Sequence, residues 1–347
     1  MDFNCELTSR IRMLQGRLEV EGVRAMLVSG RENVLYLTGG ETGRLLVTKD
    51  DALLFVKDLY KKLYIGLYDG RGYPLRVKVY GKDYVKKFVH KHRIKEVAVD
   101  NRSFASYDSL RKELKSRILI RNFVEEQRAV KSRHELALIK KSCGMASAGM
   151  MAARRVVRKG VREIEAVAEI EGVIRSLGSQ TPPFNDGMLL ASGRGSADIH
   201  AKAGSRKIAR GLVVVDLGAK YGGYYSDMTR TLAVGGISCS ERRVLEHVEN
   251  LKDEVIDSIE PGASAGVVHR QVERSLWKIR QKFYHNAGHG VGLQVHESPN
   301  IGPDSKDILE PNMVFTIEPG VYIPGKFGVR FEDTVLLTGG GCRRLTC

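Results

Sequence analysis

The chain has 347 residues, of which 42% are hydrophobic and 28% charged, and its formal net charge is +15. This balance excludes a collagen-like or wholly disordered chain, and the length allows two domains with separate cores. No apolar run approaches the ~20 residues that cross a bilayer, and Met1–Glu6 lacks the basic start and apolar stretch of a secretory signal. We therefore expect a cytoplasmic protein with no membrane partner.

The positive charge and the cysteines narrow the classes of function further. Basic residues are spread widely, as at Lys86-Lys87 and Arg154-Arg155, and no nucleic-acid recognition motif accompanies them. A solvated basic surface is therefore favoured over a nucleic-acid partner. The five cysteines contain no C-x-x-C pair, so we expect reduced thiols rather than a disulfide framework or a zinc ribbon.

Residues 1–124 form the first predicted domain. Ile11, Leu14 and Leu18 recur at helical spacing, and Gly22 is the expected stop. Further helices are predicted at 60–68, 85–89 and 109–114, and strands at 25–28, 45–47, 52–56, 75–80, 97–99 and 118–120. The second and third of these strands read as a hairpin. The alternation favours an α/β layer with a mostly parallel or mixed sheet.

Residues 125–347 form the second predicted domain. It opens with a long amphipathic helix whose buried stripe is Leu136, Ile139, Cys143, Ala146 and Met150. Helices are also expected at 163–177, 240–259 and 265–282, and strands at 188–190, 212–215, 224–225, 231–234, 313–317 and 334–337. Because strands and helices come in groups, this domain is predicted to be α+β rather than doubly wound.

Two aspartates suggest a metal site in the second domain. The apolar run 212–215 leads into Asp216, and Asp227 follows eleven residues later. A hairpin of that length can bring the two carboxylates together. Divalent cations commonly offset the repulsion between such carboxylates. Each aspartate alone would more often be a turn or helix-cap residue.

Three more metal-binding side chains follow in chain order. His289 lies between Gly288 and Gly290, which permit close backbone approach, and Glu318 comes just after an apolar strand. Arg330 and Glu332 are predicted to share one face of a strand. The glycines alone could suggest a nucleotide loop, but their spacing differs from that fingerprint. The conjunction of five ligands in order favours a paired site for Mn, Co, Zn or Fe.

The stretches VVVDLGAKYGGYYSDMTRT, HNAGHGVGLQVHESP, MVFTIEPGVYIP and GVRFEDTVLLT resemble the pita-bread metallopeptidases, the family of methionine aminopeptidase, aminopeptidase P and prolidase. The stretch NVLYLTGGETGRLLVT resembles the N-terminal domain of prolidases, aminopeptidase P and creatinases. The resemblance implies a C-terminal pita-bread domain preceded by a smaller creatinase-like α/β domain. It also implies a homodimer.

The resemblance further implies a role for each site residue. Asp216 would bind one metal ion, His289 and Glu318 the second, and Asp227 and Glu332 would bridge both. Thr229 would support a bridging carboxylate. Four residues would bind the substrate: His200, His285, His296 and Arg330. Three would take part in catalysis: His200, His296 and Glu318.

The implied reaction is hydrolysis of an Xaa-Pro peptide by a hydroxide that bridges two metal ions, Mn²⁺ or Co²⁺ before Zn²⁺ or Fe²⁺. His296 would stabilise the oxyanion, and Glu318 would pass a proton to the leaving nitrogen. An Xaa-Pro dipeptidase is favoured over an aminopeptidase P or a methionine aminopeptidase. A binding module and a metal-free creatinase-like hydrolase are the alternatives from other classes, and the complete ligand set argues against both.

Overall fold

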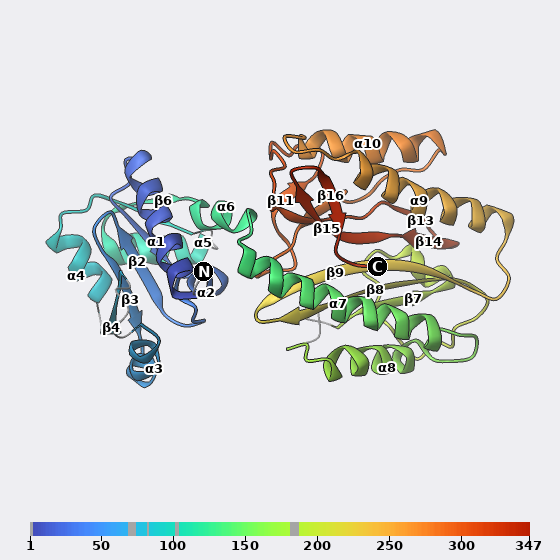
Figure 1. Ribbon diagram of the computed structural model, residues 1–347, viewed down its shortest axis with the longest axis horizontal. Coiled ribbons are helices and arrows are strands. Elements are labelled where there is room, and N and C mark those ends of the chain that lie inside the picture. Colours follow the sequence, from blue (N-terminus) through green and yellow to red (C-terminus); the bar gives the residue numbers. More distant parts are fainter. Residues whose placement is uncertain (1–2, 69–73, 82, 101–103, 181–186) are drawn as a thin grey trace. The chain divides into compact units, whose positions relative to one another are not determined.

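The computed structural model describes residues 3–68, 74–81, 83–100, 104–180 and 187–347 (Figure 1). The chain forms two compact units, Met1–Arg128 and Ala129–Cys347. The predicted boundary between residues 124 and 125 falls within helix α6 (Phe123–Ala129). No helix within the described ranges is both long and apolar enough to cross a membrane.

The first unit is built on a mixed sheet with strand order β4-β3-β2-β1-β5-β6. Its strands are β1 (Ala25–Val28), β2 (Arg44–Thr48), β3 (Ala52–Val56), β4 (Leu75–Val79), β5 (Glu96–Val99) and β6 (Arg117–Ile120). Its other helices are α1 (Phe3–Val20), α2 (Arg31–Thr38), α3 (Asp58–Tyr68), α4 (Tyr84–Lys91) and α5 (Phe104–Leu114). Strands β1 and β5 pair in parallel, whereas β2 and β3 form the predicted hairpin. The predicted α/β layer is confirmed.

The second unit is built on an antiparallel sheet with strand order β11-β10-β12-β15-β9-β8-β7, and β16 pairs with β15. These strands are β7 (Leu189–Ser192), β8 (Gly211–Tyr221), β9 (Tyr224–Val234), β10 (Gly288–Gly290), β11 (Glu297–Ile301), β12 (Val314–Ile317), β15 (Glu332–Thr338) and β16 (Gly341–Arg344). Strands β13 (Gly320–Ile323) and β14 (Phe327–Arg330) form a separate hairpin. The helices are α7 (Arg133–Val156), α8 (Glu163–Ser176), α9 (Cys239–Ser258) and α10 (Ala265–Lys278), with the 3₁₀ turn η1 (Gly193–Ala197). The predicted α+β class is confirmed.

The hairpin of β8 and β9 is the longest strand pair of this sheet. The short strands predicted at 212–215, 224–225 and 231–234 are parts of it, joined by a turn at Gly222-Gly223. Both glycines have positive φ, 56° and 88°, as a tight hairpin turn requires. The register places Asp216 opposite Thr229, and Asp227 opposite Gly218. Because side chains alternate along a strand, Asp216, Asp227 and Thr229 face one side of the sheet.

Helices cover the opposite side of this sheet in two pairs (Figure 1). Helices α7 and α8 pack against β8 and β9 in one hydrophobic cluster, and α9 and α10 pack against β12 and β15 in another. The predicted stripe of α7 is buried, with Ile139, Cys143 and Ala146 fully inaccessible to solvent. The carboxylates of β8 and β9 therefore lie on the inner side of a curled sheet.

The prediction that Arg330 and Glu332 share one strand is wrong. Arg330 ends β14, Glu332 begins β15, and Phe331 between them belongs to neither strand. The backbone changes sheet here, because β14 pairs with β13 whereas β15 pairs with β9 and β12. Both side chains nevertheless reach the same site.

We expect Ile139→Ala to lower the free energy of unfolding by about 2–5 kcal/mol, because it opens a cavity beneath α7. Met151→Ala in the same helix is the control: the Met151 side chain is 57% exposed, whereas Ile139 is buried, so the loss of stability should stay within about 0.5 kcal/mol. Urea denaturation followed by circular dichroism measures both. Equal losses would show that the stripe is not a packed core.

Candidate metal centre

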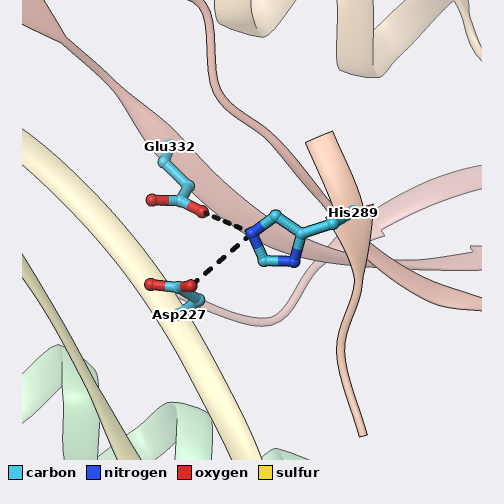
Figure 2. Close-up of side chains that lie close together, drawn as sticks. All are labelled: Asp227, His289 and Glu332. Atoms are coloured by element: carbon cyan, nitrogen blue, oxygen red, sulfur yellow. Dashed lines mark ion pairs between the residues drawn. The ribbon is translucent and has the colours of Figure 1, made fainter. Parts of the chain in front are cut away.

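Strands β9, β10 and β15 each bring one metal-binding side chain to a common point. Asp227, His289 and Glu332 offer ligand atoms that all lie within 4.8 Å of one another (Figure 2). His289 Nε2 lies 3.7 Å from Asp227 Oδ2 and 3.9 Å from Glu332 Oε1. Both carboxylates are buried, at 3% and 2% exposure. The spacing leaves room for a cation between the three side chains.

The buried carboxylate oxygens show that a cation fits this group. Among the described residues, Asp216 Oδ1, Asp227 Oδ1 and Glu332 Oε1 are buried oxygens without a hydrogen-bond partner. The other oxygen of Glu332, Oε2, accepts a hydrogen bond of 2.6 Å from the Thr229 hydroxyl. A buried carboxylate oxygen without a partner is costly, and coordination to a divalent ion removes that cost.

His289 is prepared to act as a neutral ligand. Its Nδ1 lies 3.2 Å from the carbonyl oxygen of Gly290, to which it can donate, and this leaves the Nε2 lone pair facing the carboxylates. Burial, and secondarily His296, lowers the pKa of His289 to about 3. The flanking glycines are required, since a Cβ on Gly288 would lie 1.9 Å from the Thr316 carbonyl oxygen.

Glu318 approaches the same group from the end of β12. Its Oε1 lies 3.5 Å from His289 Nε2, and its backbone N–H donates to the Ala287 carbonyl over 2.9 Å. Burial and then the charge of Glu332 raise the pKa of Glu318. The same two causes raise the pKa of Asp227, and burial followed by the charge of Asp216 raises that of Glu332 to about 8. The carboxylates thus repel one another in a dry environment.

Asp216 lies beside this group, where it meets Arg330. The guanidinium of Arg330 is 3% exposed and donates from Nη2 to Asp216 Oδ2 over 2.5 Å. Its Nε donates to the Thr229 hydroxyl over 3.2 Å. Arg330 is therefore a fixed positive charge at the edge of the carboxylates.

Tyr322 is a site residue that the sequence analysis missed. Arg330 Nη1 donates to its hydroxyl over 2.8 Å, and that hydroxyl lies 3.0 Å from His285 Nε2. His285 Nδ1 lies 2.8 Å from the carbonyl oxygen of Asn286. Burial lowers the pKa of His285 to about 4, so the neutral ring donates from Nδ1 and accepts the tyrosine proton at Nε2. The sequence signal for Tyr322 was Gly320, two residues before it. A Cβ at position 320 would collide with the Tyr322 hydroxyl, and glycine has none.

The remaining predicted residues lie at the exposed side of the site. The ring of His296 packs edge-on against His289, with centroids 4.1 Å apart. His200 is exposed, and its backbone N–H donates to Asp198 Oδ1 over 3.0 Å. Burial is the main cause that lowers the pKa of both His285 and His296, and the charge of His200 adds to it.

Comparisons with known proteins match both parts of the chain. Residues 137–339 match the metallopeptidase family M24, and residues 10–130 match the creatinase/prolidase N-terminal domain. The Xaa-Pro dipeptidase of Pyrococcus horikoshii is 31% identical, over 98% of this chain and 97% of its own.

Solved structures agree over the same length. The crystal structure of a prolidase from Pyrococcus horikoshii has a TM-score of 0.89 at 31% identity and covers 98% of each chain. An X-Pro aminopeptidase from Thermotoga maritima has a TM-score of 0.81 at 28% identity, over 95% of this chain and 97% of its own. The fold is thus the pita-bread fold with a creatinase-type N-terminal domain, and the chain belongs to metallopeptidase family M24.

Proposed function

We propose that this metallopeptidase is an Xaa-Pro dipeptidase that works with two divalent metal ions. The observation that carries the proposal is the buried group of Asp227, His289 and Glu332, in a chain similar along its whole length to an Xaa-Pro dipeptidase. Asp216 would bind one ion, His289 and Glu318 the other, and Asp227 and Glu332 both. Carboxylate-rich sites with a single imidazole suit Mn²⁺ or Co²⁺.

Divalent ions bound there supply Lewis acidity, which lowers the pKa of water and polarises a carbonyl group. The protein supplies the proton transfer. Glu318 accepts a proton from the attacking water and passes it to the leaving nitrogen, a role that suits a carboxyl whose pKa burial has raised. His296 donates a hydrogen bond to the developing oxyanion.

Substrate recognition is assigned to the residues around the metal group. His200 and His285 would line the pocket, and Arg330 would pair with the carboxylate of a dipeptide. Tyr322 supports this role, because its hydroxyl links Arg330 to His285 and holds the guanidinium in place. A cation at this position favours a substrate that ends directly after proline.

The first test is release of proline from Ala-Pro after Mn²⁺ or Co²⁺ is added. Asp227→Ala should lower kcat/KM at least about a thousandfold, because it removes a ligand shared by both ions. It should also lower the metal content measured by elemental analysis. Asp304→Ala, at an exposed carboxylate outside the group, is the control and should retain both. Full activity of Asp227→Ala would overturn the site assignment.

The second test addresses substrate length. Ala-Pro should be cleaved with a kcat/KM about 10- to 100-fold above that of its C-terminal amide, because the amide cannot pair with Arg330. A longer Xaa-Pro peptide should be a poor substrate for the same reason. Preference for the longer peptide would instead identify an Xaa-Pro aminopeptidase.

Metal binding is expected to tighten as pH rises toward about 8, where Glu332 loses its proton. Below that pH the ions must displace protons from the carboxyls. Titration calorimetry with Mn²⁺ in buffers of different ionisation enthalpy should therefore detect more proton release at about pH 6 than at about pH 9. Equal proton release at the two pH values would contradict the raised pKa values.

The same pKa shifts set the stability of the metal-free protein. In the unfolded chain these carboxyls lose their protons at about pH 4.3, whereas in the folded protein they keep them to a higher pH. Because the folded state binds more protons, these groups lower the free energy of unfolding as pH rises from about 4.3 to about 8. Added metal should reverse this loss in thermal unfolding.

We also propose that the protein is a homodimer, as its resemblance to the pita-bread metallopeptidases implies. Light scattering measures the mass of the particle in solution and distinguishes a dimer from a monomer.

A further inference from the structure

A buried ionic cluster lies behind the metal group, on the side of the sheet that the helices cover. Arg230 of β9, Lys252 of α9 and Asp333 of β15 are 6%, 5% and 1% exposed. Arg230 Nη2 donates to Asp333 Oδ1 over 2.6 Å, and Lys252 Nζ donates to Asp333 Oδ2. The Thr346 hydroxyl donates to Asp333 Oδ1 over 2.8 Å. This carboxylate is thus held by two cations.

Arg230 does more than neutralise Asp333. Its Nη1 donates to two backbone carbonyls, that of Thr229 over 3.0 Å and that of Glu332 over 2.5 Å. Thr229 and Glu332 face each other in the register of β9 and β15. On the inner side of the sheet the same two residues are joined by the hydrogen bond from the Thr229 hydroxyl to Glu332 Oε2.

The backbone pairing between β9 and β15, beside which this guanidinium donates, is short. Among the described residues, β9 and β15 pair at only two positions, Glu332 with Thr229 and Asp333 with Met228. By contrast, β8 and β9 pair along their full length. Immediately before Glu332 the chain has just left the hairpin of β13 and β14. Glu332 is therefore the first residue of β15. At the end of a strand, backbone pairing on its own restrains the position of a residue least.

We propose that Arg230 is a positioning residue of the metal centre, which fixes the backbone of Glu332 against β9 and so sets the distance between the Glu332 and Asp227 carboxylates. This inference rests on the proposed function, in which both carboxylates bridge the metal ions. Groups that orient metal ligands commonly change metal affinity 10- to 100-fold when they are removed. Arg230 performs this task from the reverse side of the sheet, through the backbone.

Lys252 provides a matched control. It is as buried as Arg230 and neutralises the same carboxylate, but its described partners are Asp333 and the neighbouring Asp253, with no contact to the backbone of Thr229 or Glu332. Loss of either cation leaves Asp333 with one cationic partner. A purely structural role predicts the same effects for both substitutions, whereas the positioning role predicts that only Arg230 affects the metal.

The experiment compares Arg230→Met and Lys252→Met in the full-length protein. Methionine is unbranched and smaller than arginine, so its side chain fits the space that Arg230 occupies. Titration calorimetry with Mn²⁺ should give a dissociation constant about 10- to 100-fold weaker for Arg230→Met, and one within about threefold of the parent protein for Lys252→Met. Urea denaturation of the metal-free proteins should show comparable losses of stability.

A second substitution covers the case in which Arg230→Met fails to fold. Arg230→Lys keeps the charge beside Asp333, but its single Nζ cannot occupy the positions of both Nη1, which contacts the two carbonyls, and Nη2, which contacts the carboxylate. It should fold and still bind Mn²⁺ more weakly than Lys252→Met does.

Three outcomes separate the hypotheses. Parental Mn²⁺ affinity in the folded Arg230 variants would overturn the positioning role. The positioning role would also be overturned if Lys252→Met weakened Mn²⁺ binding by the same factor as Arg230→Met. If the parent protein itself binds no Mn²⁺ or Co²⁺, the proposed function fails, independently of Arg230.

Discussion

Repulsion among buried carboxylates is the constraint on which the rest of this site depends. Asp227, Glu318 and Glu332 are gathered on the inner side of one curled sheet, and each has a raised pKa because burial and its neighbours disfavour the charged form. Such a group can be ionised near neutral pH only if positive charge is brought to it. The protein itself provides one cation here, Arg330, and the divalent ions that the family uses would provide the rest.

Several neighbouring features follow from that constraint. His289 is kept neutral by burial, so that its lone pair, rather than a proton, faces the carboxylates. Arg330 is held by Asp216, Thr229 and Tyr322 and cannot swing into the metal group without losing these partners. A second set of cations, Arg230 and Lys252, lies on the reverse of the sheet and neutralises Asp333. Positively charged side chains therefore lie on both faces of the sheet beside these strands.

The curled sheet makes this arrangement possible because its two faces have separate tasks. Side chains that point outward pack under the two helix pairs and supply the hydrophobic stability of the unit. Inward side chains on the same strands are free to be polar. A one-residue slip between β9 and β15 would exchange the two sets and move Glu332 into the helix-covered core. The register at Thr229 and Glu332 thus serves both stability and chemistry.

The sequence by itself determined the elements whose signals are local. The stripe of α7, the hairpin of β8 and β9 and the motifs around His289 and Glu318 can be identified because period, turn residues and spacing lie within short segments. The tertiary structure decided how distant segments meet. Chain spacing did not reveal the break at Phe331, the contact of Tyr322 with Arg330 and His285, or the bonds from Arg230 to the backbone of Glu332. These depend on which strands become neighbours, and that is set by packing of the whole sheet rather than by any local preference.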